Sequence, residues 1–219
     1  GLRVAYASGK AFESLDILWK PADGAGEAER LTDSSSNQWL SSWSPDGKVL
    51  VFMKRDEKTL YDIWFLRLEG DRKPEVFLQT PSNEIAARFS PDGRWLAYSS
   101  NESGKFEIFV RPFPSGDRKW QISTGNSSSA RWSPDGKELF YIQDKNMMAV
   151  AVSAEGASFS ADKPRKLFKA PSGWRFDVAP DGQRFVMTKS AEEEKDADRT
   201  HLTFVFNWFE ELKAKVPTK

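Results

Sequence analysis

The sequence of 219 residues predicts an all-β fold made of repeated antiparallel sheets. The tetrapeptide Ser-Pro-Asp-Gly occurs three times, and a fourth copy has Ala in place of Ser. The glycines of these copies (Gly47, Gly93, Gly136 and Gly182) stand 46, 43 and 46 residues apart. Apolar runs of strand length occupy the same positions around each copy. A period of this length is typical of a fold in which one supersecondary unit is repeated.

Each tetrapeptide has the composition of a tight turn between two strands. Proline presets φ, aspartate bonds to the local backbone, and glycine accepts the left-handed conformation that closes the turn. The residues to which we assign this structural role are Asp46, Gly47, Asp92, Gly93, Asp135, Gly136, Asp181 and Gly182. The repeat places these aspartates on separate sheets, so we expect no metal ion shared among them.

The strands follow in a constant order around each turn. First strands end before the turn at residues 43, 89, 132 and 178, and second strands cover 49–52, 95–98, 139–142 and 185–187. Third strands cover 62–66, 107–110 and 147–150, and short fourth strands cover 76–78 and 120–122. The second and third strands are apolar almost without alternation, which is typical of strands buried on both faces.

Four antiparallel strands per unit, in sheets buried on both faces, predict a β-propeller. We expect the blades at residues 1–32, 33–80, 81–124, 125–170 and 171–219. The first unit lacks its innermost strand and the last lacks its outermost strand. The five units therefore form a closed ring whose ends complete each other, or a segment of a larger ring. Aromatic residues make up 13% of the chain, enough to fill the wedges between twisted sheets.

The end of the last unit differs from the others. Residues 189–199 are rich in Glu and Asp and predict a solvated loop. A last strand is expected at 202–206 and a short C-terminal helix at 207–213, before Pro217.

Charge and rare residue types exclude several classes of function. Lys and Arg total 32 and balance 32 Asp and Glu, so the net charge gives no basis for binding nucleic acid or for direct contact with an anionic membrane. The chain has no cysteine and one histidine, His201, which excludes thiolate and multi-histidine metal sites. It contains neither a Gly-x-Ser-x-Gly nucleophile motif nor a phosphate-binding Gly-x4-Gly-Lys-Ser/Thr loop. We therefore expect a protein that is not an enzyme and uses no cofactor.

The mouth of the propeller channel is the predicted ligand site. Loops that enter the first strand of each blade gather Ser, Thr and Asn there, with Trp nearby. Aromatic surfaces beside neutral hydrogen-bonding groups suit sugars, peptides or small polar ligands, although loops are polar in any case. The candidate residues are Asn37, Trp39, Asn83, Glu84, Arg88, Asn126, Arg131, Trp174 and Arg175.

Two of these candidates, Arg88 and Arg131, stand five residues before a turn glycine on strands that line the axis. Each offers a guanidinium fork to a carboxylate or phosphate. The alternative is that they pair with Glu84 and Asp177.

The repeat resembles that of TolB-type propellers. In both, an aromatic residue precedes Ser-Pro-Asp-Gly-Lys/Arg, and an apolar strand and then Asp/Glu-Ile-aromatic follow; the resemblance covers all five units. Residues 88–104, 110–114, 131–141 and 207–212 are also similar to the C-terminal propellers of bacterial membrane-anchored serine/threonine kinases. In that family a kinase and a membrane helix precede the propeller, which is an extracytoplasmic sensor.

The resemblance implies a non-catalytic binding or sensor module on the periplasmic or extracellular side of a bacterial membrane. It further implies that the parent protein links this module to an upstream kinase and membrane helix, and we expect the module to bind an unidentified protein or a small polar ligand. The alternative is a protein–protein interaction scaffold of a TolB-like envelope protein, with no small ligand.

Overall fold

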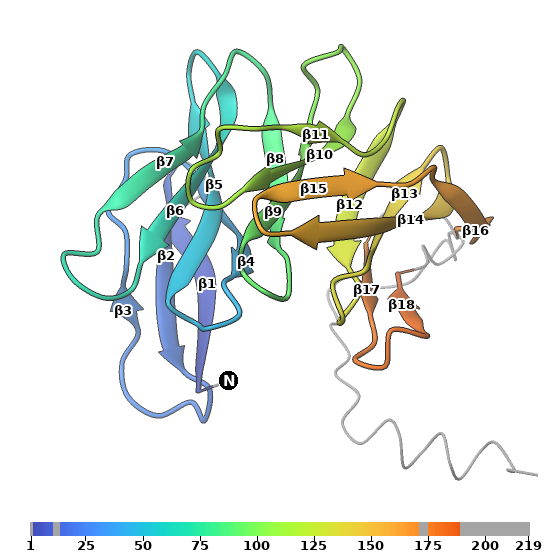
Figure 1. Ribbon diagram of the computed structural model, residues 1–219. Helices are drawn as coiled ribbons and strands as arrows, with labels where there is room; N and C mark the ends of the chain where they lie inside the picture. The colour runs from blue at the N-terminus through green and yellow to red at the C-terminus, as the bar shows by residue number, and fades with distance from the viewer. Residues whose placement is uncertain (1, 11–13, 171–174, 189–219) are drawn as a thin grey trace, which may run out of the picture. The chain divides into compact units, whose positions relative to one another are not determined.

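The computed structural model describes residues 2–10, 14–170 and 175–188, which form strands, turns and loops (Figure 1). This confirms the all-β prediction for the described residues, none of which forms a helix that could cross a membrane. These residues belong to one compact unit, Gly1–Lys189. The predicted acidic loop, last strand and C-terminal helix lie outside the described residues, as do His201 and Trp174.

The strands form five antiparallel sheets in chain order, which we number 1 to 5. Sheet 1 contains β1 (Arg3–Lys10), β2 (Ser14–Pro21) and β3 (Glu29–Arg30). Sheet 2 contains β4 (Gln38–Trp43), β5 (Val49–Asp56), β6 (Leu60–Arg67) and β7 (Pro74–Leu78). Sheet 3 contains β8 (Glu84–Phe89), β9 (Trp95–Ser100), β10 (Glu107–Pro112) and β11 (Trp120–Gln121). Sheets 2 and 3 thus have the predicted four strands in the predicted order.

Sheet 4 contains β12 (Ser127–Trp132), β13 (Glu138–Gln143), β14 (Asn146–Glu155), β15 (Ser158–Ala161) and β16 (Arg165–Lys169). Sheet 5 pairs β17 (Phe176–Val178) with β18 (Phe185–Met187). The third strand expected at 147–150 is therefore longer than predicted. Its first half pairs with β16 and its second half with β15, in a hairpin that the other repeats lack.

The β14–β15 hairpin packs against sheet 3. Phe159 of β15 contacts Trp95 and Trp120 of sheet 3 and Trp132 of sheet 4, with ring centroids 5.1, 5.7 and 6.2 Å apart. The Arg94 guanidinium of sheet 3 donates hydrogen bonds to two backbone carbonyls of the hairpin. Phe159 therefore fills the wedge between sheets 3 and 4.

Neighbouring sheets share apolar clusters, and sheets 2, 3 and 4 bury residues on both faces. The prediction is wrong for the second strands of the outer sheets, because Val4 of β1 and Val186 of β18 are 54% and 71% exposed. All six residues of β9 are buried, and so are the first four of β5. Sheets 2 and 3 pack through Phe65, Ala87 and Leu96, among others. Phe113, from the loop after β10, fills their wedge as Phe159 fills the next one. Its ring centroid lies 5.1, 5.8 and 4.9 Å from those of Phe65, Phe77 and Phe89.

The four turns share one hydrogen-bond pattern, except that the fourth has Ala in place of Ser and keeps only the bond from the Gln183 amide to Asp181. In the first of them, the carboxylate of Asp46 accepts hydrogen bonds from Ser44 Oγ at 2.5 Å and from the Lys48 amide at 3.0 Å. The hydrogen bond from Ser44 is the main cause that lowers the pKa of Asp46. The Asp46 carboxylate therefore forms its hydrogen bonds within its own turn.

The turns also pack sheet against sheet. The glycines Gly47, Gly93, Gly136 and Gly182 have φ of +71°, +73°, +72° and +69°, in the left-handed region. A Cβ atom on Gly93 would lie 3.3 Å from Cδ of Pro45 in the preceding turn. The proline of each turn therefore fits against the missing side chain of the next turn's glycine, and Gly136 and Gly182 repeat the arrangement.

The two roles of the turn glycine can be separated by comparing Gly93→Ala with Gly47→Ala. A Cβ in the left-handed region costs about 1 kcal/mol at either position. A Cβ on Gly47 meets no atom within 4 Å, whereas one on Gly93 meets Pro45. We expect Gly93→Ala to lower the free energy of unfolding more than Gly47→Ala does, as measured by urea denaturation.

In a protein that already carries Pro45→Ala, the further change Gly93→Ala should lower the free energy of unfolding by no more than Gly47→Ala does in the natural protein. Equal losses in the two single variants would contradict the packing role of the turns.

Candidate functional site

The first strands of sheets 2 to 5 (β4, β8, β12 and β17), which we call the inner strands, lie side by side. Contacts join β4 to β8, β8 to β12 and β12 to β17. In the first three of these strands the register shifts near the middle, and β8 and β12 carry left-handed non-glycine residues there, Ala86 (φ 57°) and Ser129 (φ 60°). Such bulges redirect the side chains that follow them, and strained backbone of this kind clusters at functional sites.

A pocket of about 700 Å³ opens beside these bulges, and we call it the inner-strand pocket. It is lined by residues of sheets 2, 3 and 4 and of the segment before β17. The lining residues are Trp39, Leu40, Ser41, Met53, Tyr61, Asn83, Ile85, Ala86, Arg88, Phe106, Ser129, Arg131 and Arg175.

One part of the lining is aromatic and apolar. The rings of Trp39 and Tyr61 meet edge to face, with centroids 5.5 Å apart and planes at 71°. Phe106 and Met53 extend this surface. The Met53 sulfur accepts a hydrogen bond from the Ala86 amide at 3.3 Å, which ties the bulge of β8 to sheet 2.

The other part of the lining is cationic. Arg88 and Arg131 each follow a bulge, and each guanidinium donates to the carbonyl of the residue before it, at 3.4 and 2.9 Å respectively. Arg131 Nε also lies 3.5 Å from a carboxylate oxygen of Asp177, so the predicted alternative pairing of Arg131 is present. Within the described part of the chain, Arg88 forms no ion pair, and its alternative pairing with Glu84 is wrong.

The bulge of β8 places Glu84 and Arg88 on opposite faces of the sheet. Residues four apart on a regular strand point to the same face. Between Ile85 and Arg88, however, β8 uses three steps where β9 uses two, from Ser99 to Ala97. The extra residue reverses the alternation, so Glu84 enters the interface between sheets and Arg88 lines the pocket.

Burial and like charge both act on these arginines. Burial lowers the pKa of Arg88 to about 10; the adjacent Arg131 guanidinium also lowers it, while Asp177 raises it. Burial likewise lowers the pKa of Arg131 against the attraction of Asp177. Both guanidinium groups remain charged at neutral pH. In the same lining, the Ser41 hydroxyl is buried without a hydrogen-bond partner among the described residues.

Of the nine residues predicted for the channel mouth, the pocket brings together Trp39, Asn83, Arg88, Arg131 and Arg175. Three others lie elsewhere. The Asn37 side chain accepts a hydrogen bond from the Leu15 amide at 3.0 Å. The Asn126 carbonyl accepts one from the Asp144 amide at 3.2 Å. Glu84 is buried between sheets, and Trp174 lies outside the described residues.

Sequence reasoning missed several lining residues, among them Ser41, Met53, Tyr61 and Phe106. Tyr61 and Phe106 stand at the loops between second and third strands, which share a face with the channel mouth in a propeller. An aromatic residue in such a loop could therefore have been predicted to line the pocket. Nothing in the sequence around Ser41 predicts its place in the lining, because that place depends on the bulge of β4.

Glu84 has a structural environment. Its side chain is 1% exposed, Oε1 accepts a hydrogen bond from Thr80 Oγ1 at 2.5 Å, and Oε2 has no partner among the described residues. Burial raises the pKa of Glu84, and the nearby charge of Asp62 raises it further. The corresponding residue of sheet 2 is Gln38, whose Oε1 accepts the same kind of bond from Thr32 Oγ1 at 2.5 Å.

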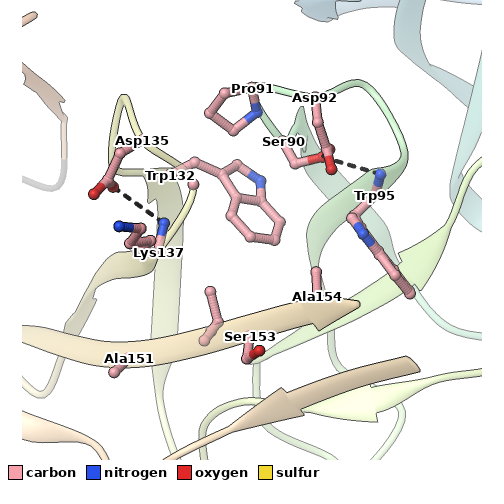
Figure 2. Close-up of a pocket in the computed structure, with 12 residues that line it drawn as sticks. Ser90, Pro91, Asp92, Trp95, Trp132, Asp135, Lys137, Ala151, Ser153 and Ala154 are labelled. Carbon is pink, nitrogen blue, oxygen red and sulfur yellow. Dashed lines mark hydrogen bonds between the residues drawn. The ribbon is translucent and has the colours of Figure 1, made fainter. Parts of the chain in front are cut away.

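A second pocket, also of about 700 Å³, lies between the turns of sheets 3 and 4 (Figure 2). Figure 2 shows Trp132 between the two turns, with β14 along one side. Its acidic groups, Asp92 and Asp135, already accept hydrogen bonds from their own turns. Among the described residues, no group of three His, Cys, Asp or Glu side chains is placed to hold a metal. The inner-strand pocket, with an unpaired charge, is the stronger candidate.

Comparison with known proteins identifies related sequences. The family model described as the TolB beta propeller domain matches residues 3–197. An uncharacterized protein of Agrobacterium fabrum is 25% identical over 140 residues, which cover 54% of this chain and 46% of that protein. The match thus spans about half the length of that curated relative.

Solved structures share the fold. TolB from Acinetobacter baumannii superposes with a TM-score of 0.68 at 20% identity, over 87% of this chain and 48% of that one. A putative TolB from Agrobacterium tumefaciens gives 0.63 at 17% identity, over 87% and 72%. The fold also occurs in enzymes, such as a periplasmic gluconolactonase of Pseudomonas aeruginosa (TM-score 0.54, 19% identity, 84% and 59%). These identities show a shared fold alone.

The environment of Glu84 predicts how stability depends on pH. Because its pKa is raised in the folded state, its contribution to stability is fully present below the ordinary value of 4.5 and is lost as the pH rises through the raised value. Glu84→Gln keeps the hydrogen bond in the form that Gln38 uses. We expect it to raise the free energy of unfolding at pH 7 by about 1 kcal/mol, the usual size of one stabilising change.

Urea denaturation from pH 4 to pH 8 measures this effect, and the exposed Glu57→Gln serves as the control. A Glu84→Gln variant that unfolds more readily than the natural protein at pH 7 would show that the carboxylate itself is needed.

Proposed function

The chain belongs to the TolB β-propeller domain family, and on that premise we propose that it is a non-catalytic binding module whose ligand site is the inner-strand pocket. The observation that carries this proposal is the half-buried Arg88 guanidinium, which forms no ion pair in the described chain. A partly desolvated charge without an ion pair costs stability. Proteins keep such destabilising groups where function requires them. We propose that a bound ligand supplies the counter-charge for Arg88.

The side chains of the pocket support binding rather than turnover. None of the described lining residues is His, Asp or Glu, the groups that most often transfer protons in catalysis. The lining instead combines guanidinium groups, a hydroxyl and aromatic rings. Enzymes such as the gluconolactonase share the fold, but chemistry depends on the site and not on the fold.

We also propose where the module works. The similarity of residues 88–104 and 131–141 to kinase-linked propellers supports a place at the C-terminal end of a receptor-type serine/threonine kinase, outside the cytoplasm. The family also supports an alternative, a TolB-like envelope protein whose propeller docks another protein and takes no small ligand.

Fractionation of the source cells tests the proposed parent protein. Antiserum against this chain should detect a band much larger than 219 residues in the membrane fraction. A soluble band of the size of this chain would contradict the link to a kinase and a membrane helix.

A thermal-shift screen of small polar compounds tests the binding site. We expect at least one compound to raise the melting temperature of the natural protein, since a ligand at 100 times its Kd stabilises by about 2.7 kcal/mol. Trp39→Ala should abolish that shift, because it removes one side of the aromatic surface. Val76→Thr, on the exposed outer strand β7, should leave it unchanged.

No shift from any compound, together with a protein partner lost on mutating the loops at the channel mouth, would favour the scaffold alternative. A shift that persists in Trp39→Ala would place the ligand elsewhere.

A further inference from the structure

We infer that the inner-strand pocket binds a carboxylate carried on an aromatic or branched apolar group, with Arg88 as its principal counter-charge. The inference rests on the proposed function and names the ligand class of the same site.

The charges around the pocket are unbalanced. Among the described residues, three arginines line it (Arg88, Arg131 and Arg175), and no acidic residue does. Arg131 is paired with Asp177, and Arg175 is exposed to water. Arg88 is the remaining charge: it is half-buried, forms no ion pair within the described chain and is next to a like charge. The described lining therefore presents one partly desolvated positive charge that is in no ion pair, although the charge of Asp177 also acts on it.

Hydrogen-bond donors also remain available at this charge. The Arg88 guanidinium donates one long hydrogen bond, 3.4 Å, to the Ala87 carbonyl, which leaves several N–H groups for a ligand. A guanidinium fork matches the two oxygens of a carboxylate.

The number of free charges favours a carboxylate over a phosphate. One monoanion neutralises Arg88 and leaves the Arg131–Asp177 pair in place. A dianionic phosphate would need a second desolvated cation. Arg131 is held by Asp177 at 3.5 Å, and the charge of Arg175 is exposed to water and screened by it. The described lining thus offers its ligand a single desolvated charge that is not in an ion pair.

The aromatic side of the pocket specifies the rest of the ligand. Trp39, Tyr61 and Phe106 form a surface that suits a ring or a branched apolar chain. A cavity of about 700 Å³ lies within the usual range for small-molecule sites. In an N-acylated amino acid, and at the carboxyl end of a peptide, a carboxylate lies close to an apolar side chain, as this pocket requires.

Calorimetric titration of the full chain with matched probes tests this inference. N-acetylphenylalanine and N-acetylphenylalaninamide differ only in the carboxylate, and phenyl phosphate presents the dianion. We expect the acid to bind at least tenfold more tightly than either of the other two probes. Arg88→Met should reduce the affinity for the acid at least tenfold and leave the weak binding of the amide unchanged. Arg118→Met, exposed and outside the pocket, is the control.

Thermal melting of Arg88→Met without ligand separates loss of binding from loss of folding. Removing a half-buried charge that forms no ion pair should leave the melting temperature at or above that of the natural protein.

Equal affinity for the acid and the amide would overturn the role of the carboxylate, and tighter binding of phenyl phosphate would overturn the choice of anion. If none of the probes binds but a screened compound shifts the natural protein and not Trp39→Ala, the binding function stands and the carboxylate inference fails. If neither kind of ligand is found, both fail.

Discussion

The structure depends on the packing of sheets that are apolar on both faces. The middle strands show this most clearly: every residue of β9 is buried, and sheets 2 and 3 share one apolar cluster. No such sheet is stable in water alone, so each requires a neighbour on both sides. Two devices set the fit between neighbours. The proline of one turn packs against the glycine of the next, and an aromatic ring such as Phe113 or Phe159 fills the wedge.

The candidate site depends on a difference between the middle strands and the inner strands. Because the middle strands supply the packing, the inner strands can depart from regular pairing, and three of them do. At the bulges, Ala86 and Ser129 have positive φ, a backbone conformation that residues other than glycine rarely adopt. Their effect is to direct Arg88 and Arg131 into a pocket where burial and mutual repulsion act on both charges. The strain and the unpaired charge occur at the same place.

Glu84 and Arg88 show how one bulge places two neighbouring charged residues in different environments, one between sheets and one in the pocket. Both side chains are charged types held away from water, and they stand four residues apart on β8. Burial raises the pKa of Glu84, which lies between sheets and bonds to Thr80. Burial lowers the pKa of Arg88, which faces the pocket. Had β8 been regular, the two side chains would lie on the same face of the sheet.

The sequence by itself determined the repeat, the positions of most strands and the burial of both sheet faces, because local spacing and the Pro-Asp-Gly turn encode them. It also placed Arg88 and Arg131 together, since the repeat assigns them equivalent positions, and Trp39 near the loops of the channel mouth. Only the tertiary structure decided the β14–β15 hairpin, the place of Ser41 in the lining and the separation of Glu84 from Arg88. The place of Ser41 depends on the bulge of β4, and the separation of Glu84 from Arg88 depends on the bulge at Ala86. These residues carry no turn signal, so packing between sheets rather than their own preferences imposes their conformation.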